Sequence, residues 1–95
     1  MIEELLKSGS CSIVDVRSPA EFMGGHVIGS INIPIQEIEY RFEELSSLTH
    51  PLILCCASGG RSGMAMQYLR SKGIDCHNGG GWMEVNYVVS QLDQS

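Results

Sequence analysis

One stretch near the middle of the chain, residues 52–63, constrains the fold more than any other. Residues 52–56 are apolar and follow Pro51, which predicts a strand buried on both faces. After Ser62, apolar residues recur at helical spacing until Gly73 ends the pattern. A strand, a short loop and a helix in this order direct backbone N–H groups and the positive end of a helix dipole at one point. The stretch is therefore a candidate active site.

Two adjacent cysteines, Cys55 and Cys56, end the predicted strand at this point. A thiolate there would be stabilised, and its pKa would be lowered. Arg61 closes the loop and could offer its fork of donors to a substrate anion. The residues between Cys56 and Arg61 are small enough for their N–H groups to converge on an anion: Ala57, Ser58, Gly59 and Gly60. The pattern predicts a thiolate nucleophile in a cradle of backbone donors, and it is more ordered than a buried cysteine followed by a flexible turn requires.

The rest of the chain alternates predicted strands and helices. Apolar runs predict strands over residues 12–16, 26–33 and 74–78, with a glycine turn at 79–81. Helical patterns cover residues 2–7, 35–45 and 82–92, and Ser18, Pro19 and Glu21 predict a capped short helix between the first two strands. Strands alternating with helices over short loops predict a parallel α/β domain with helices on both faces.

Composition narrows the function classes. The 95 residues predict one domain, residues 1–95, and 43% hydrophobic with 18% charged residues is typical of a globular chain. A net charge of −5 without a Lys/Arg cluster argues against a nucleic-acid surface. No apolar run reaches the roughly 20 residues of a membrane span, and no leader pattern is present. The four cysteines show neither a disulfide framework nor zinc spacing, so we expect a cytoplasmic protein with free thiols and no metal.

Two further polar residues are expected beside the loop. Asp15 and Arg17 lie at the end of the first predicted strand. Ligand sites in parallel sheets lie beyond the carboxyl ends of the strands, so Asp15 and Arg17 should lie at the same edge as Cys56. We expect both to support the site.

Four blocks of the sequence resemble one family. Residues 56–63 resemble the C-x-x-G-x-R-S-G active loop of rhodanese-like sulfurtransferases. Residues 15–22 are similar to the family's D-x-R-x-x-x-E-[FY] segment, and residues 25–34 to its G-H-I-x-G-A-x-N-I-P segment. Residues 79–82 match its late G-G-x-x-W region with a shorter gap. The resemblance extends over nearly the whole chain.

The resemblance implies a three-layer rhodanese-like α/β fold with a five-stranded parallel sheet flanked by helices. It implies that Cys56 carries sulfane sulfur as a persulfide, taken from a small anionic donor such as thiosulfate. The acceptor would be cyanide or a thiol, including a protein thiol, and no cofactor is implied. Loop N–H groups from Ala57 to Ser62 would stabilise the persulfide, and Arg61 would orient the loop or bind the donor. Asp15 and Arg17 would help to hold the loop.

The sequence departs from the family pattern at Ala57, where a basic residue is common in members active on thiosulfate. A missing charge near the surface weakens attraction for a dianionic donor by about 1 kcal/mol.

Two alternatives remain. Counted from Cys55, the loop reads C-x5-R, the spacing of cysteine phosphatases and phosphatase-like arsenate reductases. Their signature places glycine three residues after the cysteine, and that glycine is present when counting from Cys56 (Gly59) but not from Cys55 (Ser58). The register therefore favours Cys56. A non-catalytic partner-binding module is the third hypothesis, because a fold does not determine a function.

Overall fold

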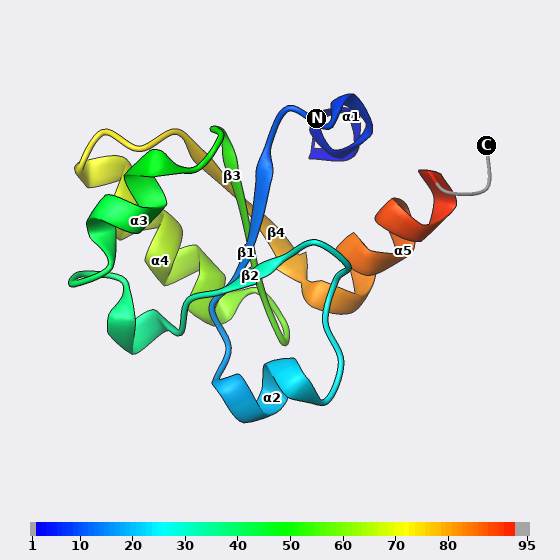
Figure 1. Ribbon diagram of the computed structural model, residues 1–95, viewed down its shortest axis with the longest axis horizontal. Helices are drawn as coiled ribbons and strands as arrows, with labels where there is room; N and C mark the ends of the chain where they lie inside the picture. The colour runs from blue at the N-terminus through cyan, green and yellow to red at the C-terminus, as the bar shows by residue number, and fades with distance from the viewer. Residues whose placement is uncertain (1, 93–95) are drawn as a thin grey trace.

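The computed structural model describes residues 2–92, which form one parallel sheet flanked by helices (Figure 1). The strands are β1 (Ser12–Asp15), β2 (Ile31–Asn32), β3 (Leu52–Cys56) and β4 (Cys76–Gly81), in the order β2-β1-β3-β4. The helices are α1 (Ile2–Ser8), α2 (Pro19–Met23), α3 (Phe42–Ser47), α4 (Gly60–Ser71) and α5 (Trp82–Leu92), with a 3-10 turn, η1, at Ile35–Glu37.

Strand β3 lies at the centre of the sheet, and all five of its residues are buried. It pairs in parallel with β1 on one side and β4 on the other. An apolar, uninterrupted sequence is what a strand covered on both faces requires, because neither face meets water. The prediction for residues 52–56 is confirmed.

Two apolar clusters separate the sheet from its helices and make the fold three-layered. One cluster joins the sheet to η1, α3 and α4, and includes Leu54, Leu45 and Leu69. The other joins the opposite face to α1 and α5, and includes Ile53 and Val85. Figure 1 shows α3 and α4 on one side of the strands and α1 and α5 on the other.

The α/β class and the flanking helices are confirmed, but the number of strands implied by the resemblance is wrong for the described part of the chain. The sheet has four strands rather than five. The sequence itself contains four strand patterns, and each one overlaps an observed strand. Residues 2–8, which precede β1, form a helix, so no described segment remains to add a fifth strand.

Two predicted elements are shorter than their sequence patterns. The strand expected over residues 26–33 is reduced to Ile31–Asn32, because a turn closed by the Ser30 N–H and the Val27 carbonyl precedes it. The helix expected over 35–45 is divided into η1 and α3. Its stripe nevertheless predicts burial correctly, since Ile38 and Leu45 both lie in the core. Burying such a stripe does not require one continuous helix.

Strand β4 continues through the glycines that were expected to form a turn. A Cβ on Gly79 would lie 2.9 Å from Ile53 Cγ2 and 3.1 Å from the Leu54 carbonyl oxygen. The register between β3 and β4 shifts after Leu54, as in a β-bulge. Glycine is needed here because only a residue without a side chain lets β4 approach β3 so closely.

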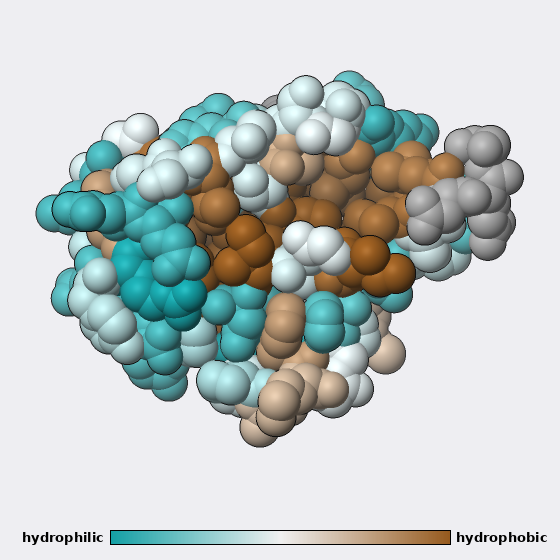
Figure 2. Space-filling model, in the orientation of Figure 1, coloured by the Kyte–Doolittle hydropathy of each residue, from teal (hydrophilic) through white to brown (hydrophobic). Residues whose placement is uncertain are grey.

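The sheet face under α1 and α5 is incompletely covered. Figure 2 shows apolar, brown side chains exposed between these two helices and beside β2. A groove there is lined by Leu6, Ile13, Ile31, Val89 and Leu92 among others. None of the helices in residues 2–92 is long and apolar enough to cross a membrane.

Candidate active site

The candidate site lies where the strands end. Because β1 and β3 are parallel, Asp15 at the end of β1 pairs with Cys55, and Cys56 follows at the same edge. Helix α2 and the loop that joins β3 to α4 lie together at the lower edge of the view in Figure 1. The expectation that Asp15, Arg17, Cys56 and Arg61 gather at the carboxyl ends of the strands agrees with this arrangement.

Three hydrogen-bond donors point at the sulfur of Cys56. The N–H of Gly59 donates to Sγ at 3.0 Å, and the N–H of Ser62 donates at 3.5 Å. The Ser62 hydroxyl also lies 3.4 Å from Sγ. Gly59 has a φ of +102°, a left-handed conformation that residues with side chains rarely adopt, and this conformation precedes the start of α4. The loop folds around the thiol because Gly59 can take this turn.

The surroundings of Cys56 favour its thiolate. Burial acts to raise the pKa, but hydrogen bonds from the Ser62 hydroxyl and from the N–H groups of Ser62, Ser58 and Gly59 outweigh it. The pKa of Cys56 is lowered to about 7. Hydrogen bonds to the charged form of a group are the cause of such shifts. Cys56 is therefore substantially ionised near neutral pH.

The side chain of Asn78 ties β4 to the loop. Its Nδ2 donates to the Gly59 carbonyl at 3.0 Å, and its Oδ1 accepts from the Gly80 N–H at 3.0 Å. The Ser62 hydroxyl lies 2.7 Å from the same Oδ1, so its single proton is shared between Asn78 and the Cys56 sulfur. Sequence reasoning missed Asn78. The available signal was its place at the end of the last predicted strand, on the edge that carries the site.

The guanidinium of Arg61 contacts a carboxylate of the protein. Its Nη1 and Nη2 donate to the two oxygens of Glu21 at 2.8 and 3.0 Å. Hydrogen bonding to Arg61, followed by bonding to the Ser18 N–H, lowers the pKa of Glu21 to about 2. The sequence identified Glu21 as the capping residue of α2, which it is, but not as a neighbour of the loop.

Asp15 and Arg17 form a buried pair beneath the site. Arg17 donates to Asp15 through its backbone N–H, Nε and Nη2, with the shortest contact at 2.7 Å. Its Nη2 also donates to the Gly25 carbonyl, and its guanidinium lies 4.8 Å from the ring centroid of Trp82. Neither side chain has a hydrogen bond to Cys56 in the structure. These contacts join the end of β1 to the segment after α2 and to the start of α5, and a supporting role for the two residues stays a prediction.

Cys55 has a different environment from Cys56. Its side chain is fully buried in the cluster under α1 and α5, whereas Cys56 belongs to the cluster on the other face. Burial raises the pKa of Cys55 to about 12. This geometry does not favour Cys55 as a nucleophile. The phosphatase-like C-x5-R spacing requires Cys55 to be the thiolate, so the geometry does not favour that alternative either.

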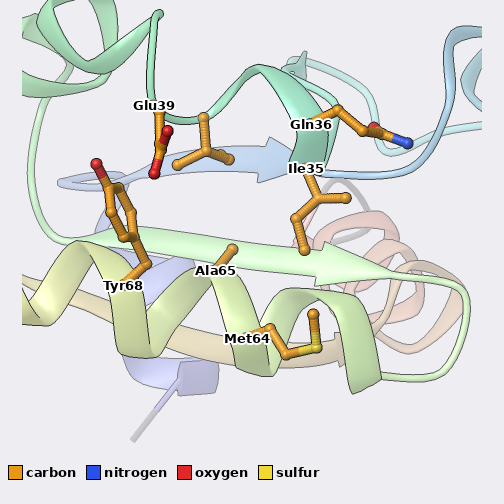
Figure 3. A pocket seen from close by; sticks show the side chains of 7 residues that line it. Ile35, Gln36, Glu39, Met64, Ala65 and Tyr68 are labelled. Carbon is orange, nitrogen blue, oxygen red and sulfur yellow. The ribbon is translucent and has the colours of Figure 1, made fainter.

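The remaining loop residues, Ala57, Ser58 and Gly60, are exposed. A separate groove of about 270 Å³ lies between η1 and α4 (Figure 3). Ile35, Met64 and Tyr68 line it, and no residue from Cys56 to Ser62 does. Cys56 itself is 1% exposed, beneath these loop residues, and the groove is a neighbouring feature of the surface.

The sequence of the whole domain now identifies its relatives. The family model described as a rhodanese-like domain matches residues 1–86. The chain belongs to the rhodanese-like domain family. Its curated relatives include the uncharacterized protein YqhL of Bacillus subtilis, 39% identical over 77% of this chain and 59% of that protein. The thiosulfate sulfurtransferase GlpE of Stutzerimonas stutzeri is 34% identical over 73% of this chain and 62% of that protein.

Solved rhodanese structures share the fold. A rhodanese with anions from E. coli has a TM-score of 0.71 and 30% identity, over 78% of this chain and 89% of that one. The human single-domain sulfurtransferase TSTD1 has a TM-score of 0.67 and 30% identity, over 87% of each chain. This rhodanese-like domain spans 59% of the length of YqhL and 41% of the uncharacterized protein slr1261 of Synechocystis.

Proposed function

We propose that this rhodanese-like domain is a sulfurtransferase that carries sulfane sulfur as a persulfide on Cys56. The observation that supports the proposal best is the convergence of the Gly59 and Ser62 N–H groups and the Ser62 hydroxyl on the Cys56 sulfur. A thiolate is the nucleophilic form of cysteine, and a pKa of about 7 makes it available at neutral pH. Family membership and relatives named as sulfurtransferases point in the same direction.

The proposed reaction has two steps. In the first, the Cys56 thiolate attacks the outer sulfur of a donor such as thiosulfate, the donor's S–S bond breaks, and sulfite leaves with the bonding electrons. In the second, a thiolate or cyanide attacks the terminal sulfur of the persulfide, and Cys56 leaves as a thiolate. No external oxidant, reductant or cofactor takes part. The N–H groups of the loop, from Ala57 to Ser62, hold the negative charge at both stages.

A small sulfur-containing anion is the proposed donor, and the proposed acceptor is cyanide or a thiol, including the thiol of a protein. The exposed position of Ala57 and Ser58 leaves the loop accessible to such partners. The four cysteines, all within the described residues, are free. Since the chemistry needs reduced thiols, the cytoplasm is the proposed location.

Mass spectrometry tests the proposed nucleophile directly. After incubation with thiosulfate, the wild-type protein should gain about 32 Da, the mass of one sulfur atom, on Cys56, because its thiol is the one that ionises near neutral pH. Cys55→Ser should retain the adduct and the transfer of sulfur to cyanide, whereas Cys56→Ser should lose both. An adduct on Cys55 alone would overturn the proposal.

The same variants separate the other hypotheses. Hydrolysis of an aryl phosphate that is abolished by Cys55→Ser would support the phosphatase-like activity. A folded protein whose Cys56 never accepts sulfur would instead support a partner-binding module.

A further inference from the structure

Most of the positively charged side chains of this domain are either paired with carboxylates elsewhere or lie far from the loop. All six Lys and Arg residues lie within residues 2–92, and Lys7, Arg17 and Arg41 pair with carboxylates of their own segments. Arg70 and Lys72 lie at the opposite end of α4 from Cys56. Arg61, in the first turn of α4, is therefore the one cation of the described chain that an anion approaching the loop from solvent would meet.

Arg61 is itself neutralised by Glu21. The contact is bidentate, at 2.8 and 3.0 Å, which is the strongest arrangement that a guanidinium and a carboxylate form. Glu21 is also held by Ser18 at the start of α2, whose N–H and hydroxyl donate to Oε1, the same oxygen that accepts from Arg61 Nη1. An incoming donor would have to displace a carboxylate that the capping box holds in place.

We infer, on the basis of the proposed sulfurtransferase activity, that Glu21 sets the charge of the donor, so that the loop favours sulfane donors with one negative charge over the thiosulfate dianion. With Arg61 and Glu21 cancelling, the charge near the loop is that of the Cys56 thiolate. A dianion is repelled by it twice as strongly as a monoanion of the same size. Organic thiosulfonates and organic persulfides are the donor class that meets this requirement.

The reaction of such donors balances without any further reactant. The Cys56 thiolate attacks the outer sulfur of an organic thiosulfonate, R–SO2–S⁻, and the donor's S–S bond breaks. The sulfinate R–SO2⁻ leaves with the electron pair, and Cys56 holds the persulfide. With an organic persulfide the leaving group is a thiolate. In each case one negative charge enters with the donor and one departs with the leaving group.

Methanethiosulfonate and thiosulfate make a matched pair of probes, because a methyl group in the first replaces a charged oxygen in the second. We would measure kcat/KM for both donors, with cyanide as the acceptor, in wild type and in Glu21→Gln. Glutamine keeps an oxygen for the capping box but removes the charge. Since the electrostatic effect scales with donor charge, a threefold gain for methanethiosulfonate should accompany about a tenfold gain for thiosulfate. Both gains should shrink as salt is added.

Two further variants make the test decisive. Glu43→Gln, on α3, changes the net charge equally and should leave the ratio of the two donors unchanged. Ala57→Arg adds a cation to the loop while Glu21 and Arg61 stay intact, and it should also raise thiosulfate turnover more than methanethiosulfonate turnover. Ala57→Arg can also be measured if Glu21→Gln does not fold.

The outcomes separate this inference from the proposed function. If Cys56 accepts sulfur from both donors but neither Glu21→Gln nor Ala57→Arg changes their ratio, the inference is wrong and the sulfurtransferase proposal stands. An equal change of the ratio in Glu43→Gln also overturns the inference, because the effect is then one of net charge. If Cys56 accepts sulfur from neither donor, both the inference about Glu21 and the proposed sulfurtransferase function are wrong.

Discussion

At the scale of single residues, Cys55 and Cys56 differ because successive side chains of a strand point to opposite faces of the sheet. Cys55 is enclosed by the apolar cluster under α1 and α5, and burial raises its pKa to about 12. Cys56 points to the other face, where Ser62 and the loop N–H groups donate to its sulfur. One peptide bond along the chain therefore separates an inert thiol from one with a pKa of about 7.

Replacing Ser62 by alanine should raise the pKa of Cys56, because the Ser62 hydroxyl is the largest of the hydrogen-bond contributions that lower it. The rate of alkylation by iodoacetamide, followed at Cys56 by mass spectrometry as a function of pH, should reach half its maximum near pH 7 in wild type. In Ser62→Ala the midpoint should move up by about one pH unit, the size of one charge-assisted hydrogen bond.

Ser58→Ala is the matched control for this prediction. Ser58 contributes through its backbone N–H, which alanine retains, so the midpoint should stay where it is in wild type. Equal midpoints in Ser62→Ala and wild type would contradict the role assigned to the hydroxyl.

At the scale of elements, α2 and α4 are joined through one carboxylate. Glu21 caps α2 through Ser18 and pairs with Arg61 at the start of α4. The carboxylate thus completes a local motif that the sequence predicts and a contact across 40 residues that it does not.

The lowered pKa of Glu21 predicts a pH-dependent contribution to stability. Its pKa of about 2 in the folded protein lies below the ordinary value of 4.5, so the unfolded chain binds more protons between these values. The stabilisation should be complete above about pH 5 and should disappear as the pH falls toward 2. Urea unfolding of wild type and Glu21→Gln at pH 6 and pH 3 tests this expectation. The difference in unfolding free energy should be smaller at pH 3, and an equal or larger difference there would contradict it.

Gly79 and Gly60 test the close approach of β4 to β3. A Cβ on Gly79 would lie 3.0 Å or less from methyl carbons of Ile53 and Val85, whereas nothing lies within 4 Å of a Cβ on Gly60. Gly79→Ala should destabilise the domain by about 1–3 kcal/mol through overpacking. Gly60→Ala, at the first residue of α4, should be neutral or stabilising by up to about 1 kcal/mol. Urea unfolding curves measure both, and equal stabilities of the two variants would argue against the steric account of β4.

At the scale of the whole molecule, Arg17 connects three parts of the fold. It leaves the end of β1, pairs with the buried Asp15, donates to the carbonyl of Gly25 after α2, and lies over Trp82 at the start of α5. Its side chain and that of Asp15 are 5% and 0% exposed, so each charge depends on the other for compensation.

Arg17→Leu should therefore be strongly destabilising, because it leaves Asp15 buried without its partner. We expect a loss of about 3–5 kcal/mol in the free energy of unfolding, measured by urea titration. The double variant Asp15→Asn with Arg17→Leu should recover part of this loss, since no buried charge then remains. A double variant less stable than Arg17→Leu would show that hydrogen bonding and packing outweigh the charge.

Much of the domain follows from local patterns. Apolar runs and helical stripes locate all four strands and indicate which side chains are buried, because burial on one or both faces imposes a period on the sequence. Ser18, Pro19 and Glu21 predict the start of α2 correctly, since a capping box needs only neighbouring residues. The lengths of β2 and β4 did not follow from local patterns, because the turn before β2 and the glycines of β4 depend on how these segments fit against β1 and β3.

The strand–loop–helix at residues 52–63 was determined by the sequence itself, because a buried strand, small loop residues and a helix start are each encoded within a few positions. What surrounds the Cys56 thiol was decided only by the tertiary structure. The parallel sheet brings Glu21 to Arg61 and Asn78 to Ser62, pairs that lie 40 and 16 residues apart in the chain. No local pattern records such pairs, since their geometry exists only when the ends of β1, β3 and β4 meet at one edge.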